Sequence, residues 1–196
     1  MKLRHVLKVV LFLACLVPLG LLGLGLFDGS IGPNPVEALN RNLGDWALRF
    51  LLITLALRPL AEITGRKSLI VYRRVLGLSA FFYALAHMGN YVIIDLQLDL
   101  AAFTEDVLKR NFITIGVICF TALLAMAATS TKGMIRRMGG RNWRRLHWLI
   151  YPISALGVLH FYMMVRADFR EPLLYGVIVA AALAYRVIVA KRKVVA

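Results

Sequence analysis

Three of the four histidines in the chain lie in, or at the edge of, long apolar segments. They are His87, His147 and His160. An ionisable side chain at membrane depth is costly and seldom faces lipid, so it usually marks a site inside a helix bundle. Imidazoles that approach from two separate helices can hold a flat metal cofactor between them. The residue types therefore predict a cofactor site within the membrane.

The spacing of the histidines separates them into a pair and a single residue. His87 lies 14 residues beyond Arg73, and His160 lies 13 residues beyond His147, which is at the boundary of its apolar segment. At 1.5 Å per helical residue, His87 and His160 share a level about 20 Å above that boundary, and His147 lies about 20 Å below them. Two opposed imidazoles at one depth suit a six-coordinate haem iron, which transfers single electrons instead of binding oxygen.

Each histidine also has a purely structural interpretation. A single histidine in a membrane helix can be a polar anchor that is hydrogen-bonded to a neighbouring helix. His147 can be an interfacial residue beside Trp143, and His5 lies among basic residues near the N-terminus. Thirteen residues are also about 140° out of phase on an ideal helix, so His147 need not share a face with His160.

Small residues favour the cofactor interpretation over the structural one. Ala84 and Gly157 lie three residues before His87 and His160, and we expect them to let a bulky ring approach the backbone. A zinc or copper site would need three or four converging ligands, and no second histidine, cysteine or carboxylate lies one turn from any of these imidazoles. No arrangement of catalytic residues is recognisable, so no catalytic residue is predicted.

The composition predicts that the elements carrying these histidines are membrane helices. The chain has 196 residues, of which 60% are hydrophobic, and its mean hydropathy is +0.74. The chain has a net charge of +14, and its basic residues lie between the apolar segments, as expected for topology signals. We therefore predict a lipid-embedded protein that binds no nucleic acid. The two cysteines lie inside apolar segments and form no recognisable metal or disulfide pattern.

The hydrophobic pattern predicts an all-α bundle of six transmembrane helices in a single domain over residues 1–196. The second helix is the weakest, because Arg49 and Arg58 limit its uncharged centre, and Asp45 is expected to cap its start. Pro152 is expected to kink the fifth helix. The first apolar segment is interpreted as a retained helix and not as a cleaved signal. The expected helices cover about residues 6–27, 46–61, 75–94, 111–131, 146–165 and 172–190.

The distribution of charge predicts the orientation of this bundle. With six spans, both termini share a side with the connections 58–74 and 130–145, and that side holds 18 of the 24 basic residues against one acid, Glu62. The opposite side holds the other six basic residues and nine acids, including Asp95, Asp99, Glu105 and Asp106. The positive-inside rule then places both termini in the cytoplasm.

Three stretches of sequence resemble a known family. They are RRVLGLSAFFYALAH (73–87), LLAMAATS (123–130) and RRMGGRNWRRLHWLIYPISALGVLHF (136–161). These stretches closely resemble MsrQ (also called YedZ), a family of bacterial haem-binding membrane subunits, and the similarity covers essentially the whole chain. More distantly, the chain is similar to the transmembrane domain of ferric reductases and NADPH oxidases.

The resemblance implies a function and a set of cofactors. It implies a subunit of the bacterial inner (plasma) membrane that binds haem b, as one or two groups, together with FMN. Electrons would come from the quinone pool or a cytoplasmic flavin reductase and pass to MsrP, a periplasmic molybdopterin enzyme that reduces methionine sulfoxide in proteins. This role is electron transfer within an oxidoreductase system and not catalysis of the reduction itself.

The resemblance also assigns the histidines. His87, His147 and His160 match the family's histidine positions, with His87 and His160 as ligands of an outer haem and His147 as a ligand of an inner one. NADPH oxidases carry a second histidine pair, but here Arg73 stands at the inner position of the third helix. This departure leaves two alternatives, either no inner haem at His147 or an inner haem with an unusual sixth ligand such as Arg73 or Arg74.

Two other functions remain open at this point. The chain could be a stand-alone quinone or ferric reductase that needs no periplasmic partner. Less consistent with the sequence is a non-redox transporter subunit, in which the histidines would relay protons or serve packing. Transporters of this length generally need an internal repeat, and the sequence has none that we can recognise.

Overall fold

The computed structural model describes residues 2–195, and over that range the regular structure is entirely helical. Two short irregular helices flank α3: the 3-10 helix η1 precedes it and the π-helix η2 follows it. The elements are α1 (Lys2–Phe27), α2 (Pro35–Ile63), η1 (Lys67–Tyr72), α3 (Arg73–Gly89), η2 (Asn90–Asp95), α4 (Leu100–Lys109), α5 (Asn111–Ala128), α6 (Lys132–Met138), α7 (Gly140–His147), α8 (Ile150–Met164) and α9 (Arg170–Val195).

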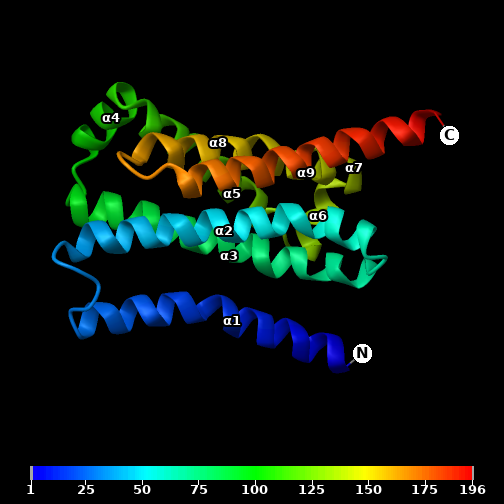
Figure 1. Ribbon diagram of the computed structural model, residues 1–196, viewed down its shortest axis with the longest axis horizontal. Helices are drawn as coiled ribbons and strands as arrows, with labels where there is room; N and C mark the ends of the chain where they lie inside the picture. The colour runs from blue at the N-terminus through cyan, green and yellow to red at the C-terminus, as the bar shows by residue number, and fades with distance from the viewer. Residues whose placement is uncertain (1, 196) are drawn as a thin grey trace.

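The long helices run side by side, with α2 at the centre of the packing. Helix α2 contacts α1, α3, α8 and α9, and α5 fills the space between α3 and α8 (Figure 1). The start of α1 and the end of α9 lie at one end of the bundle together with α6 and α7, whereas α4 lies at the other end (Figure 1). The bundle thus has one end with the termini and one end with α4.

Five segments of the described chain are long and apolar enough to cross a membrane. They are Leu3–Phe27, Lys67–Asp95, Asn111–Ala128, Gly140–Met164 and Arg170–Val189. The prediction of six spans goes one beyond these five. Helix α2, which contains the predicted span 46–61, is 29 residues long but carries several charges.

The two arginines within the predicted span of α2 have partners on the neighbouring helices or on α2 itself. Arg49 donates from Nε to the Tyr175 hydroxyl at 2.8 Å, lies 3.6 Å from Glu171, and has its guanidinium 5.0 Å from the centre of the Trp46 ring. Arg58 pairs with Glu62 at 3.0 Å. Charged groups at membrane depth persist when they are paired in this way, so α2 can lie inside the bundle despite its composition.

Several boundaries differ from the predicted ones. The prediction that Asp45 caps the second helix is wrong, because α2 begins ten residues earlier with Pro35, and the side chain of Asn34 accepts from the Glu37 N–H. A proline is favourable in the first turn, where its missing N–H would have had no helical partner. Helices α4 and α6 were not predicted. Both are short, and each begins at a side-chain cap, Asp99 for α4 and Thr131 for α6.

The predicted fifth helix is interrupted near Pro152. Helix α7 ends at His147 and α8 begins at Ile150, so Trp148 and Leu149 form a turn between two helices. Proline has no N–H to donate to the carbonyl four residues earlier, which here belongs to Trp148. That carbonyl accepts from the Tyr151 N–H at 3.1 Å instead. The break therefore follows from the proline, one turn away.

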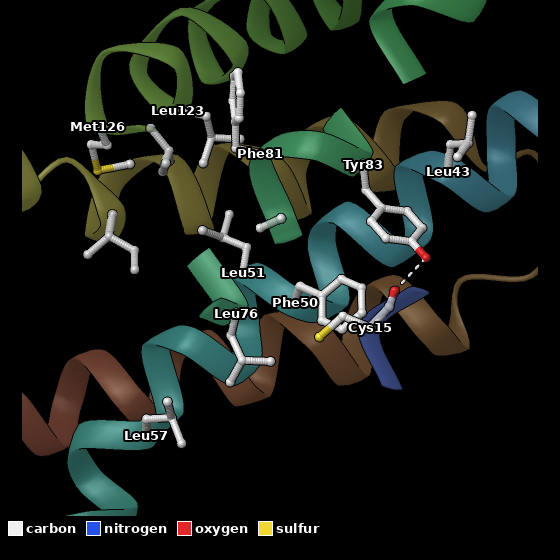
Figure 2. Packing of buried hydrophobic residues seen from close by; sticks show 13 residues of the cluster. Cys15, Leu43, Phe50, Leu51, Leu57, Leu76, Phe81, Tyr83, Leu123 and Met126 are labelled. Atoms are coloured by element: carbon white, nitrogen blue, oxygen red, sulfur yellow. Dashed lines mark hydrogen bonds between the residues drawn. The ribbon is translucent and has the colours of Figure 1, made fainter. Parts of the chain in front are cut away.

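Helix α1 is attached to the bundle by a tyrosine of α3. Tyr83 donates its hydroxyl to the Cys15 carbonyl at 2.8 Å (Figure 2). The same hydroxyl accepts from the Leu19 N–H at 3.0 Å. These two backbone groups are the ones that a regular helix would join to each other, and they flank Pro18. The hydroxyl thus bridges the backbone of α1 where the proline disturbs it.

The buried core around this contact joins α1, α2, α3, α5 and α8. Phe50 of α2 packs against Tyr83 of α3, with 5.2 Å between ring centres, and both lie close to Cys15 (Figure 2). The fully buried members of the cluster are Cys15, Leu43, Phe50, Leu51, Leu57, Leu76, Ala80, Phe81, Tyr83, Leu123, Met126, Ile150 and Ile153.

Candidate functional site

The structure brings two of the three histidines together. His87 of α3 and His160 of α8 face each other with 6.3 Å between their ring centres and 84° between their ring planes. Both side chains are half-buried inside the bundle. The two helices do not pack closely on each other, because α2 and α5 lie between them. The pair therefore lies where α2, α3, α5 and α8 meet.

One ring nitrogen of each imidazole, Nδ1, is held by a backbone carbonyl. Nδ1 of His87 lies 2.9 Å from the Asn40 carbonyl of α2, and Nδ1 of His160 lies 2.7 Å from the Phe112 carbonyl of α5. A carbonyl only accepts, so Nδ1 carries the hydrogen and donates it, and the lone pair of the neutral ring is on Nε2. Ligand histidines in metal sites are usually oriented by such a hydrogen bond.

Two glycines make room for the rings. A Cβ at Gly44 of α2 would lie 3.2 Å from Cε1 and Nδ1 of His87, and a Cβ at Gly116 of α5 would lie 3.1 Å from Cε1 of His160. These distances are shorter than ordinary van der Waals contacts. The glycines thus let each imidazole lie directly against the backbone of a neighbouring helix.

Ala84 and Gly157 do not accommodate the imidazoles themselves. A Cβ at Gly157 would meet the side chain of Leu48 at 3.2 Å, so this glycine serves the contact between α8 and α2. Ala84 packs against the buried core. The backbone that lies directly against the imidazoles belongs to α2 and α5 and not to the helices that carry the histidines.

The geometry of the pair fits two axial ligands of one metal ion. Two metal–nitrogen bonds of about 2 Å, with each nitrogen about 1 Å from its ring centre, put opposed ring centres about 6 Å apart. The observed separation is 6.3 Å. Nε2, the nitrogen with the lone pair, makes no hydrogen bond to any described residue of the chain in either ring. His87 and His160 therefore fit the ligands of a haem iron.

His147 lies apart from the pair, as its spacing predicts. Its Nδ1 lies 3.0 Å from the Trp143 carbonyl, and its ring stacks on the Trp143 ring with 4.0 Å between centres. Trp143 in turn donates from Nε1 to the Thr129 carbonyl at 3.1 Å. In all three apolar-segment histidines a backbone carbonyl thus lies at Nδ1, and His147 interacts in addition with the backbone of Met126.

The two arginines near His147 differ in their surroundings. Arg73 lies at the start of α3, close enough to interact electrostatically with His147, and its side chain is half-buried. Its Nε is buried and makes no hydrogen bond to the described residues. The side chain of Arg74 is exposed.

Sequence reasoning missed the residues that support the histidines. The carbonyls of Asn40 and Phe112 leave no trace in residue type, because every residue has a carbonyl. Gly44 and Gly116 are two of 15 glycines, and nothing in their local sequence distinguishes them. Only the packing of α2 and α5 against the rings identifies these four positions.

Comparison with known proteins identifies the family of the chain. Residues 43–158, which include His87 and His147 and end two residues before His160, match the family described as "Ferric reductase like transmembrane component". Three relatives carry the name "Protein-methionine-sulfoxide reductase heme-binding subunit MsrQ". The one from Rhodospirillum rubrum is 42% identical over 186 residues, which is 95% of this chain and 89% of the relative.

The other two relatives are similarly close over most of their length. The relative from Herminiimonas arsenicoxydans is 45% identical, and the similarity covers 95% of this chain and 86% of the relative. The relative from Caulobacter vibrioides is 44% identical, and the similarity covers 91% of this chain and 85% of the relative. The chain therefore belongs to the MsrQ family and has a ferric reductase-like transmembrane domain.

Proposed function

We propose that the chain is a haem b electron-transfer subunit of a methionine sulfoxide reductase system, and that His87 and His160 are the axial ligands of its outer haem. The observation that carries the proposal is the pair of opposed imidazoles with ring centres 6.3 Å apart. When bound, a haem iron with two protein ligands supplies one-electron transfer. The names of the relatives, which describe heme-binding subunits, support the same cofactor.

The protein's part in this function is to hold the two imidazoles in position. The hydrogen bonds to the Asn40 and Phe112 carbonyls orient the rings and keep the Nε2 lone pair directed into the bundle. Gly44 and Gly116 set how far each ring lies from its neighbouring helix. Both ligands are therefore fixed by α2 and α5, which carry neither histidine.

A second, inner haem would use His147. The stacked and hydrogen-bonded ring of His147 is oriented in the same manner as the outer pair. Of the two arginines that could lie opposite, Arg73 is favoured, because it is half-buried near His147 whereas Arg74 is exposed. We assign no residue to FMN, which stays an implication of the family resemblance.

We further propose the direction of electron flow. Helix α2 would be the sixth span, so that both termini lie in the cytoplasm with the basic end of the bundle. Electrons would enter at this end, from quinol or a cytoplasmic flavin reductase. They would leave at the acidic end, to a periplasmic MsrP-like molybdopterin reductase that repairs methionine sulfoxide. The protein would be a multi-pass subunit of the bacterial inner membrane.

Spectra of purified variants test the haem assignment. The wild-type protein should show a reducible b-type spectrum, and His87→Ala and His160→Ala should each abolish the outer haem signal. His147→Ala should leave that signal intact and lower the haem-to-protein ratio only if an inner haem is present. His5→Ala is the matched control and should match the wild type. A colourless wild-type preparation from haem-replete cells would refute the proposal.

The partner is tested separately by reconstitution. The reduced wild-type protein should be reoxidised by an added MsrP-like enzyme in the presence of a methionine sulfoxide substrate. Direct reoxidation by ferric ions or quinone, with no effect of the added enzyme, would favour a stand-alone reductase.

A further inference from the structure

A cavity lies between α2, α8 and α9 near the end of the bundle that carries the termini. Its volume is about 160 Å³. Part of its wall is apolar, formed by Leu55, Pro59, Ala182 and Val189, and Arg58 and Arg186 contribute the positive charge. The cavity therefore combines an apolar wall with guanidinium groups, and it lies apart from the paired histidines.

The positive charge around this cavity exceeds the negative charge. Arg58 and Arg186 both interact electrostatically with Arg73, which lies beside them at the start of α3. Glu62 pairs with Arg58 at 3.0 Å. Neither Arg73 nor Arg186 forms an ion pair with a carboxylate within residues 2–195, and Arg186 instead lies over the Tyr151 ring at 4.1 Å. Of the three guanidinium groups, only that of Arg58 is thus paired with a carboxylate within the described residues.

One of these arginines has a buried donor without an acceptor. Nε of Arg73 is shielded from solvent and makes no hydrogen bond to the described part of the chain. An unsatisfied buried donor on a charged group is costly, and an anionic oxygen would satisfy it. This guanidinium adds positive charge beside the cavity that Arg58 and Arg186 line.

The surroundings indicate which anion it is. The cavity also offers an apolar surface, because Leu55 and Pro59 of α2 and Ala182 and Val189 of α9 line it beside the guanidinium groups. A ligand that fits has a phosphate group for the guanidiniums and an apolar chain for this surface. Basic pockets between membrane helices on the cytoplasmic side bind anionic phospholipid head groups in this way. We propose that Arg58 and Arg186, beside the positive charge of Arg73, form a binding site for the phosphate of an anionic phospholipid.

Native mass spectrometry of the purified full-length protein in detergent tests this site. The protein is titrated with phosphatidylglycerol and, in parallel, with zwitterionic phosphatidylcholine. Wild-type protein should bind phosphatidylglycerol at least about tenfold more tightly. Arg186→Gln should lower that affinity about tenfold or more, since a hydrogen bond to a charged group is lost. Lys191→Gln removes the same charge from an exposed position on the same helix and should leave the affinity unchanged.

A second variant guards against a folding defect in the first. Arg58→Gln should lower the affinity for phosphatidylglycerol in the same direction as Arg186→Gln. Equal affinities for the two lipids, or variants that bind phosphatidylglycerol as the wild type does, would overturn the proposal. Displacement of the lipid by low concentrations of inorganic phosphate or FMN would also overturn it, because the site would then serve a soluble phosphate. None of these outcomes depends on electron transfer.

Discussion

At the scale of single residues, the main feature is how little of the histidine site depends on side chains. His87 and His160 are oriented by backbone carbonyls, and they are accommodated by glycines. A carbonyl acceptor cannot be removed by substituting its own side chain, so the orientation of each ring depends on the position of α2 or α5. Substitutions at the glycines are the direct way to disturb it.

Gly44→Ala and Gly116→Ala should each weaken haem binding. The new methyl group would lie about 3.1–3.2 Å from atoms of the imidazole, so the ring must shift. Loss of the orienting contacts of a metal ligand typically costs at least about tenfold in affinity, and we expect a loss of that order. The measurement is the haem-to-protein ratio and the absorption spectrum of the purified variants.

Gly20→Ala is the control for these two variants. A Cβ at Gly20 has open space around it, and alanine favours a helix over glycine by about 1 kcal/mol. Gly20→Ala should therefore leave the spectrum unchanged. Equal behaviour of all three variants would show that the glycines near the rings have no special role.

The histidines themselves could be found from the sequence, and their supporting residues could not. Ionisable residues in apolar segments are rare, so residue type and spacing were sufficient to pair His87 with His160 at one depth. The positions of Gly44 and Gly116 depend on how α2 and α5 rotate about their axes. That rotation follows from packing across the whole bundle and leaves no local pattern.

At the scale of helices, polar groups determine where several elements begin, break or attach. Asn34 and Asp99 begin α2 and α4, Pro152 accompanies the break between α7 and α8, and Tyr83 attaches α1. The long apolar helices were predictable, because their hydrophobic runs exceed the thickness of the bilayer core. Helix α4 was not, because ten residues of mixed polarity resemble a loop.

Tyr83→Phe should loosen α1 from the bundle. The hydroxyl satisfies the Cys15 carbonyl and the Leu19 N–H, and lipid offers neither a donor nor an acceptor in its place. We expect a loss of about 1–3 kcal/mol, seen as a lower unfolding temperature in detergent and faster amide exchange around Pro18. Tyr162→Phe, which alters a half-exposed ring on α8, should have little effect. Equal losses in the two variants would contradict this role.

Asp99→Ala should destabilise α4. The carboxylate of Asp99 accepts from the N–H groups of Ala101 and Ala102, both at 2.9 Å. Removing such a cap costs about 0.5–2 kcal/mol, so limited proteolysis within 100–109 should become faster. Asp95→Ala removes a nearby exposed carboxylate and serves as the control. Unchanged proteolysis of Asp99→Ala would show that tertiary contacts alone hold α4.

At the scale of the whole molecule, the two ends of the bundle carry opposite charge. The end with the termini holds 18 basic residues and one acid, whereas the other end holds six basic residues and nine acids. This asymmetry was readable from the sequence once the spans were assigned. The assignment of α2 was the weak step, because Asp45, Arg49 and Arg58 make it resemble a soluble helix.

The orientation of the bundle can be tested with single cysteines. Thr104→Cys places an exposed thiol on α4, and Arg141→Cys places one on α7. If the basic end is cytoplasmic, a membrane-impermeant thiol reagent applied to cells with a permeabilised outer membrane should label only the first variant. Disruption of the inner membrane should then expose the second. The wild-type chain gives the background of Cys15 and Cys119, and the reverse pattern would invert the proposed electron flow.

The bridge between Tyr83 and α1 bears on how the protein is made. Synthesis runs from the N-terminus, so α1 leaves the ribosome well before Tyr83, which lies 64 residues after Leu19. Until α3 arrives, the turn around Pro18 lacks the hydroxyl that completes it, in a solvent that cannot substitute. The first helix therefore reaches its final hydrogen bonding only after the third has entered the membrane, so the packing of α1 depends on a later part of the chain.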